Sequence, residues 1–157
     1  MKIIKNDKPD LIKTDFKCDK PLSRHLNDKI IYKHMNKSFC CALVSKPGGG
    51  KTTHLTSLLQ TKSFYKKVFY HIYLFMPKSS LDSMKDNIFD EIDDSQKFSN
   101  GVTFDDLNYV YEQLLENTKN NENSLIVFDD VQSSFSDKEI SMNLLHIINN
   151  RRHYKCS

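Results

Sequence analysis

The sequence contains little glycine, proline or cysteine, and it has no apolar run long enough to cross a bilayer. Four glycines and four prolines among 157 residues exclude a fibrous or low-complexity chain. The cysteines Cys18, Cys40, Cys41 and Cys156 form neither a CxxC pair nor a disulfide framework. We therefore expect a reducing, intracellular setting in which they are small buried side chains. The lysine-rich segment 1–10 lacks the apolar stretch of a secretion signal, and no segment approaches the roughly 20 apolar residues of a membrane span.

What the sequence does contain is enough apolar material for one domain, together with charge that is unevenly distributed. Hydrophobic residues make up 38% of the chain, which excludes wholesale disorder. Residues 1–38 carry ten Lys and Arg against five Asp, a net of +5, whereas residues 81–123 carry three against eleven acidic residues, a net of −8. We expect a basic, polar N-terminal extension over 1–37, either a solvated arm or a contact for nucleic-acid phosphates, followed by one domain over 38–157.

Short apolar runs alternate with helical spacings along that domain. The runs predict buried strands at 38–44 (SFCCALV), 68–76 (VFYHIYLFM) and 124–128 (SLIVF). Apolar residues at three- and four-residue spacing predict helices at 52–60 and 103–117, a further helix behind a capping box formed by Ser136 and Glu139, and a short helix at 81–89. Strands alternating with helices indicate an α/β fold with a parallel sheet flanked by helices.

A glycine-rich segment follows the first predicted strand and leads into a helix. It reads Ser45-Lys46-Pro47-Gly48-Gly49-Gly50-Lys51-Thr52, the GxxxxGK[ST] phosphate loop with serine in the first position. Glycine allows the unusual backbone angles and the close approach that a loop wrapped around a triphosphate requires. We expect nucleotide contacts from Ser45, Lys46, Pro47, Gly48, Gly49, Gly50, Lys51, Thr52 and Thr53. Lys51 is expected to neutralise the β/γ-phosphates, and the Thr52 hydroxyl to bind Mg²⁺.

Two aspartates follow the last predicted strand. Carboxylates at the C-terminal end of a parallel strand lie where open α/β sheets bind ligands. We expect Asp129 to hold Mg²⁺ and Asp130 to act as the general base that activates water. The predicted catalytic residues are therefore Lys51 and Asp130, and the predicted metal ligands are Thr52 and Asp129.

The end of the sequence leaves two questions open. Arg151 and Arg152, which follow the last predicted helix, fit three roles: an arginine finger for a neighbouring subunit, a DNA contact, or a cation at the helix C-terminus. The second question is the strand order. In kinase-like sheets the acidic strand lies directly beside the phosphate-loop strand, whereas in RecA-like sheets a later strand, which would begin after Tyr154, separates them.

Together these residues resemble a known family. SKPGGGKTT after FCCALV, HIYLFMP, LIVFDDV, and NRRHYKCS after a helix are similar to the genome-packaging ATPases of large nucleocytoplasmic DNA viruses and virophages, which belong to the FtsK–HerA superfamily of RecA-like motors. The resemblance covers residues 39–157. It implies a RecA-like P-loop NTPase domain, truncated before its remaining strands, that uses ATP and Mg²⁺.

The resemblance also implies partners and a location. The expected protein is a homo-oligomeric ring that hydrolyses ATP and drives double-stranded DNA into a capsid, in contact with capsid proteins and without a membrane. Its expected location is the viral factory in the host cytoplasm, or the virion. Two alternatives remain: a small nucleoside or nucleotide kinase, and a nucleotide-binding interaction module without catalytic activity.

Overall fold

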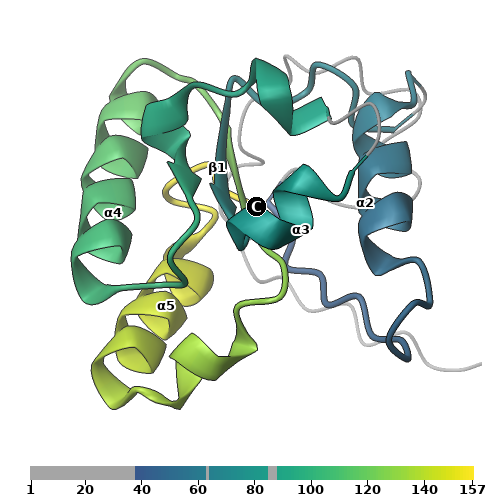
Figure 1. The fold of residues 1–157 in the computed structure, drawn as a ribbon. Helices are drawn as coiled ribbons and strands as arrows, with labels where there is room; N and C mark the ends of the chain where they lie inside the picture. Colours follow the sequence, from purple (N-terminus) through teal and green to yellow (C-terminus); the bar gives the residue numbers. More distant parts are fainter. Residues whose placement is uncertain (1–37, 63, 85–87) are drawn as a thin grey trace, which may run out of the picture.

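A three-stranded parallel sheet forms the centre of the protein (Figure 1). The computed structural model describes residues 38–157 apart from 63 and 85–87, so the predicted basic extension over 1–37 lies outside the described residues. The strands are β1 (His71–Phe75), β2 (Lys97–Phe98) and β3 (Ser124–Phe128), in the order β2-β1-β3. Both strand pairs are parallel, which confirms the α/β class.

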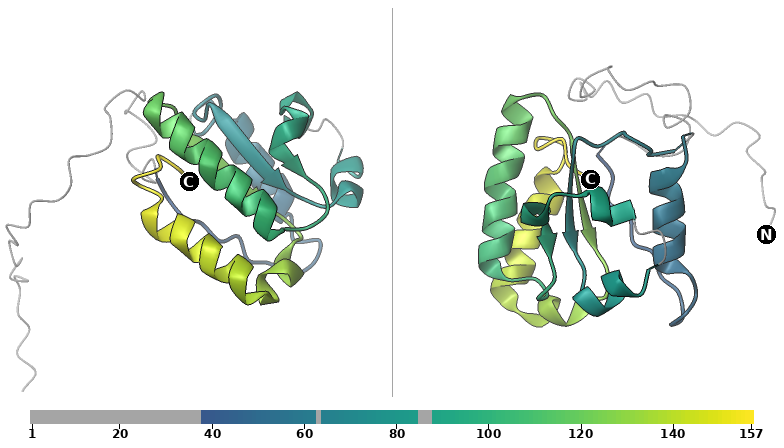
Figure 2. Two further views of the ribbon diagram at one scale, coloured as in Figure 1. Left: turned by 90° about the vertical axis from the view of Figure 1, so that its left-hand side faces the viewer. Right: turned by 45° about the horizontal axis from the view of Figure 1, so that its top comes forward.

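Helices cover both faces of this sheet. Helices α2 (Lys51–Gln60) and α3 (Lys78–Asp82) lie on one face, and α4 (Phe104–Lys119) and α5 (Lys138–Asn150) lie on the other (Figures 1 and 2). Short 3-10 helices span Ile88–Glu91, Asp94–Gln96 and Gln132–Ser136. The three predicted helices at 52–60, at 103–117 and after residue 136 are therefore confirmed.

The alternation of side chains along β1 divides the core into two layers. Tyr73 and Phe75 pack with the buried leucine and isoleucine side chains of α4 and α5, whereas Leu74 and Met76 pack toward α2 and α3. Phe75 is fully buried, with ring centroids 4.4 Å from Phe98 and 4.9 Å from Phe128. Because both faces of the central strand are covered, it reads as a continuous apolar run in the sequence.

Helices α4 and α5 both begin at an N-cap side chain, and for α5 it is not the predicted one. The Thr103 hydroxyl oxygen accepts the N–H of Asp106 at 3.1 Å, as an N-cap does. For α5, the predicted cap Ser136 is wrong, because that residue lies inside a 3-10 helix and its hydroxyl donates to the C=O of Ser133. Asp137, in extended conformation, caps α5 instead and accepts two backbone N–H groups of the first turn.

The predicted strand at 38–44 is wrong. These residues have no regular secondary structure, Val44 is 92% exposed, and both Cys40 and Cys41 are exposed, contrary to our expectation. Of the described cysteines only Cys156 is buried. The physical reason is that this segment does not pair with the backbone of a strand. The Phe39 N–H donates to the Ser157 hydroxyl oxygen, which is a side-chain atom.

The segment between β1 and α4 also differs from the prediction. The short helix expected at 81–89 starts earlier, at Lys78, and α3 ends at Asp82. Pro77 stops β1 and leads directly into this helix. The two-residue strand β2 was not predicted. It pairs Lys97 with Leu74 of β1, and its sequence is too short to carry an alternating pattern.

The end of the described chain lies beside β3. Cys156 pairs in parallel with Ser124 on the edge of β3 that faces away from β1. The Ile126 N–H then donates to the Ser157 C=O at 2.8 Å. A position beside β3 is thus occupied by residues that follow α5, as the RecA-like alternative predicts. The segment leading to the phosphate loop forms no strand, so it has no place in the sheet order.

None of the helices in the described part of the chain has both the length and the apolar character that a bilayer span requires.

Candidate nucleotide site

The phosphate loop has the backbone conformation that its glycines were expected to provide. Gly48 and Gly50 have φ angles of 72° and 77°, in the left-handed region where a side chain is unfavourable. Gly50 is the residue before α2, so the helix begins at Lys51 and turns the N–H groups of its first turn toward the loop. The local sequence therefore places free N–H groups at the start of a helix, where an anion is favoured.

The middle glycine is required by space rather than by its backbone angles. A Cβ atom on Gly49 would lie 2.6 Å from the Ser45 hydroxyl oxygen and 2.9 Å from the Lys46 C=O. The same C=O accepts the Gly49 N–H at 2.9 Å, which closes the loop. Ser45 itself does not have a left-handed φ angle. Serine in the first position of the motif is therefore compatible with the loop.

The loop and the acidic pair meet, as the sequence predicts. The Thr52 hydroxyl donates to the Asp129 carboxylate at 2.6 Å, although 77 residues separate them in the sequence. Both side chains are half-buried. The N–H of Asp129 donates to the Phe75 C=O at 3.0 Å, so the parallel pairing of β1 and β3 fixes the height of Asp129 at the sheet edge.

Asp130 has an unusual backbone conformation. Its φ angle is 56°, in the left-handed region that aspartate tolerates better than most residues. Its side chain is exposed, and its carboxylate accepts the Ser80 hydroxyl at 3.2 Å. Ser80 belongs to neither of the two sequence motifs. The available signal was its place just after the second strand, at the edge where open α/β sheets bind ligands.

A cavity of about 620 Å³ brings the predicted catalytic and metal-binding residues together. Lys51, Thr52, Asp129 and Asp130 line it, along with side chains of 39–43, α2, β3 and α5. Its lining also includes Cys156, where burial raises the pKa of the thiol to about 12. The remaining predicted contacts, Ser45, Lys46, Pro47, the three loop glycines and Thr53, are exposed around the loop.

The oxygen atoms of Thr52 and Asp129 suit a magnesium ion. Mg²⁺ prefers hard oxygen ligands and commonly takes only one or two from the protein, the rest coming from water and substrate phosphates. A hydroxyl and a carboxylate 2.6 Å apart provide such a pair. The described residues contain no cluster of three His, Cys, Asp or Glu side chains that would indicate a zinc-type site.

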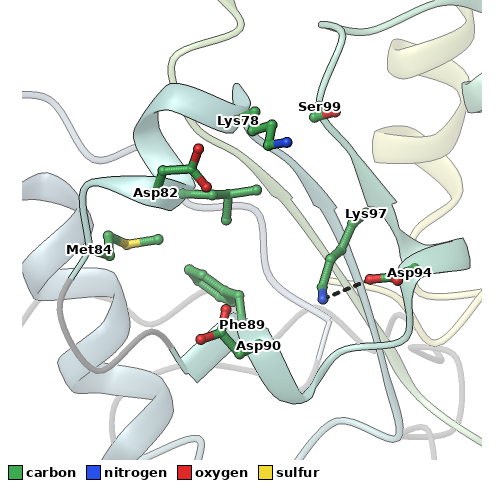
Figure 3. Close-up of a pocket in the computed structure, with 9 residues that line it drawn as sticks. Lys78, Asp82, Met84, Phe89, Asp90, Asp94, Lys97 and Ser99 are labelled. Atoms are coloured by element: carbon green, nitrogen blue, oxygen red, sulfur yellow. Dashed lines mark hydrogen bonds and ion pairs between the residues drawn. The ribbon is translucent and has the colours of Figure 1, made fainter.

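A second cavity, of about 590 Å³, lies beside α3 and β2 (Figure 3). Lys78, Asp82 and Asp90 line it, and Lys97 there donates to Asp94 at 3.1 Å. Neither the phosphate loop nor the acidic pair contributes to its lining. Its charges are of both signs, so it does not favour a polyanion as the phosphate loop does.

Arg151 occupies the position of a helix-terminal cation. Its guanidinium donates to the C=O of Ile148 in the last turn of α5 and to the C=O of Ser38. The helix-cap interpretation is therefore confirmed for Arg151, while Arg152 is exposed. The Arg151 C=O accepts the N–H of Cys156, which pairs with Ser124 at the start of β3, whereas Asp129 follows the end of that strand.

Comparison with models of protein families gives a match over most of the chain. The family model described as Poxvirus A32 protein matches residues 27–157. Neither the curated proteins nor the solved structures contain a match to this chain.

Proposed function

The chain belongs to the poxvirus A32 protein family, a family of viral packaging ATPases, and from this premise we propose that it is an ATP-hydrolysing motor that packages viral double-stranded DNA into capsids. The observation that carries the proposal is the 2.6 Å contact between Thr52 of the phosphate loop and Asp129 of the acidic pair. A phosphate loop joined to a strand-end carboxylate is the arrangement that nucleotide hydrolysis needs.

In the proposed reaction, the backbone N–H groups of the loop and of the first turn of α2 receive the phosphate oxygens. Lys51 neutralises charge on the β- and γ-phosphates. A water oxygen forms a bond to the γ-phosphorus while the bond from that phosphorus to the β–γ bridging oxygen breaks. Asp130 accepts a proton from this water, and ADP and phosphate are the products.

Thr52 and Asp129 are the residues that would hold Mg²⁺, Thr52 directly and Asp129 through water. Such an ion would neutralise part of the charge on the phosphate oxygens. Because the Thr52 hydroxyl is hydrogen-bonded to the Asp129 carboxylate, these two residues also fix the distance between the loop and the sheet edge.

The remaining parts of the proposal follow from the family. We propose that the chain works as a homo-oligomeric ring on double-stranded DNA, with capsid proteins as partners, in the viral factory of the host cytoplasm or in the virion. The position of Cys156 and Ser157 beside β3, which the RecA-like alternative predicts, supports a motor of this kind rather than a kinase.

Steady-state phosphate release tests the proposal, measured with and without double-stranded DNA. We expect ATP hydrolysis that DNA stimulates and that Lys51→Ala abolishes. Lys62→Ala is a matched control, because Lys62 is an exposed lysine beyond the end of α2. Sedimentation with nucleotide and DNA tests the ring.

Two results would replace the proposal with an alternative. Transfer of the γ-phosphate to a nucleoside or nucleotide would identify a kinase. Tight ATP binding without turnover, under conditions in which DNA also binds, would identify a nucleotide-binding interaction module.

A further inference from the structure

Ser80 lies beside the proposed general base although it belongs to neither sequence motif. Its hydroxyl donates to the Asp130 carboxylate at 3.2 Å across 50 residues of sequence. Nothing in the phosphate loop or the acidic pair indicates this contact. It arises because α3 follows β1 directly, and β1 pairs with the strand that ends at the two aspartates.

Short-range contacts fix the place of Ser80. Pro77 restricts the exit from β1, and its C=O accepts the N–H groups of Ser80 at 2.9 Å and of Leu81 at 3.1 Å. The Leu81 side chain packs against the buried cluster that contains Leu74 and Met76. Because one turn of α3 is held both by the strand end and by the core, the hydroxyl of Ser80 has a defined position.

Asp130 is constrained at both its backbone and its side chain. The left-handed φ of 56° sets the direction of its Cα–Cβ bond, and the Ser80 hydroxyl binds one of its two carboxylate oxygens. An exposed aspartate would otherwise sample several rotamers. With one oxygen held, the other can accept a proton from water in a fixed direction, which is the geometric requirement of a general base.

We propose that Ser80 is a positioning residue for ATP hydrolysis, whose hydroxyl orients the Asp130 carboxylate toward the attacking water. The inference rests on the proposed function, since it assigns a role within the same site. It requires no contact between Ser80 and the nucleotide. Loss of the hydroxyl should therefore lower turnover and leave substrate binding nearly unchanged.

The test compares three variants of the full chain. Ser80→Ala should lower kcat about ten-fold, less than the roughly 10²- to 10⁴-fold cost of losing a general base, because the carboxylate remains. KM for ATP should change less than about two-fold, since Ser80 contributes no ground-state binding. Ser80→Thr keeps a hydroxyl and should restore most of kcat. Ser79→Ala is the matched control: Ser79 is exposed in the same turn of α3 and makes no hydrogen bond to Asp130.

A double-mutant comparison separates positioning from a structural effect. In an Asp130→Asn background, Ser80→Ala should have no further effect on the residual rate, because the group that it orients is already lost. Equal losses from Ser80→Ala in both backgrounds, or an unchanged kcat in Ser80→Ala, would overturn the role of Ser80 while the proposed function stands. Absence of hydrolysis by the unsubstituted chain, with its ability to bind ATP verified, would overturn the proposed function and this role together.

Discussion

The glycines of the phosphate loop should respond differently to alanine, because the structure requires Gly49 for space, and Gly48 and Gly50 for their left-handed backbone. At Gly50 the added Cβ would meet no atom within 4 Å, so the cost is only that of the left-handed backbone, about 1–2 kcal/mol. Since about 1.4 kcal/mol corresponds to a ten-fold change in affinity, Gly50→Ala should weaken binding of a fluorescent ATP analogue about ten-fold.

At Gly49 the backbone angle is ordinary but the space is filled. A Cβ would lie 2.6 Å from the Ser45 Oγ and 2.9 Å from the Lys46 C=O, and that C=O cannot move without breaking the hydrogen bond that closes the loop. Overpacking of this kind costs about 1–3 kcal/mol, so we expect the larger loss, up to about 100-fold. Ser45→Gly in the same chain removes the nearest contacts and should restore part of the affinity, about ten-fold.

The assay is titration of the analogue with Mg²⁺, followed by fluorescence anisotropy. Gly101→Ala is the control, because Gly101 also has a left-handed φ, of 89°, but lies outside the loop; it should lower thermal stability without changing affinity. If Gly49→Ala binds more tightly than Gly50→Ala, or if Ser45→Gly restores nothing in the Gly49→Ala chain, the loop geometry described above is wrong.

Three further predictions address the site, the core and the pH dependence of stability. Asp130→Asn should retain nucleotide binding and lose hydrolysis, whereas Asp129→Ala should weaken Mg²⁺-dependent binding. Rapid-quench measurements of hydrolysis and equilibrium titration of binding distinguish these two effects. Normal turnover by Asp130→Asn would refute the general-base assignment. Phe75→Ala should lower the unfolding free energy by about 3–5 kcal/mol, because the ring is fully buried between two other rings. Urea denaturation followed by circular dichroism measures this loss. A loss of less than about 1 kcal/mol, a quarter of the usual cost, would contradict the packing. Burial raises the pKa of Cys156 from 9.0 to about 12, so between these pH values the folded chain keeps a proton that the unfolded chain loses. The contribution of this thiol to the unfolding free energy is therefore complete below pH 9.0 and is lost as pH rises toward 12. The loss is at most about 1.4 kcal/mol per pH unit. Cys156→Ala should flatten that pH dependence, and an unchanged slope would assign it to other groups.

The site was predictable from the sequence to the extent that its parts are local. The glycine run specifies its own backbone conformation, and Lys51 starts α2 where the motif places it. Asp129 directly follows a strand whose bounds, Ser124–Phe128, match the apolar run. The meeting of Thr52 with Asp129 was inferred from the rule that parallel strands present their C-terminal ends at one sheet edge, and the contact is present although the residues before the loop form no strand.

The contacts of Ser80 and Arg151 could not be inferred in that way. Each joins segments far apart in the sequence, and each depends on where a neighbouring element packs. Ser80 reaches Asp130 because α3 follows β1 on the appropriate side of the sheet. Arg151 binds the C=O of Ser38 because the chain passes the end of α5 on its way to the loop.

By itself, therefore, the sequence determined the phosphate loop, the acidic strand end, the amphipathic helices and the α/β class, because each is encoded by neighbouring residues and by the periodicity of apolar side chains. Only the tertiary structure decided that residues 38–44 do not form a strand and that Lys97–Phe98 does. It also decided that Cys156 and Ser157 lie beside β3. The physical reason is that a strand is completed by the backbone hydrogen bonds of its partner, and an apolar run does not specify which segment provides them.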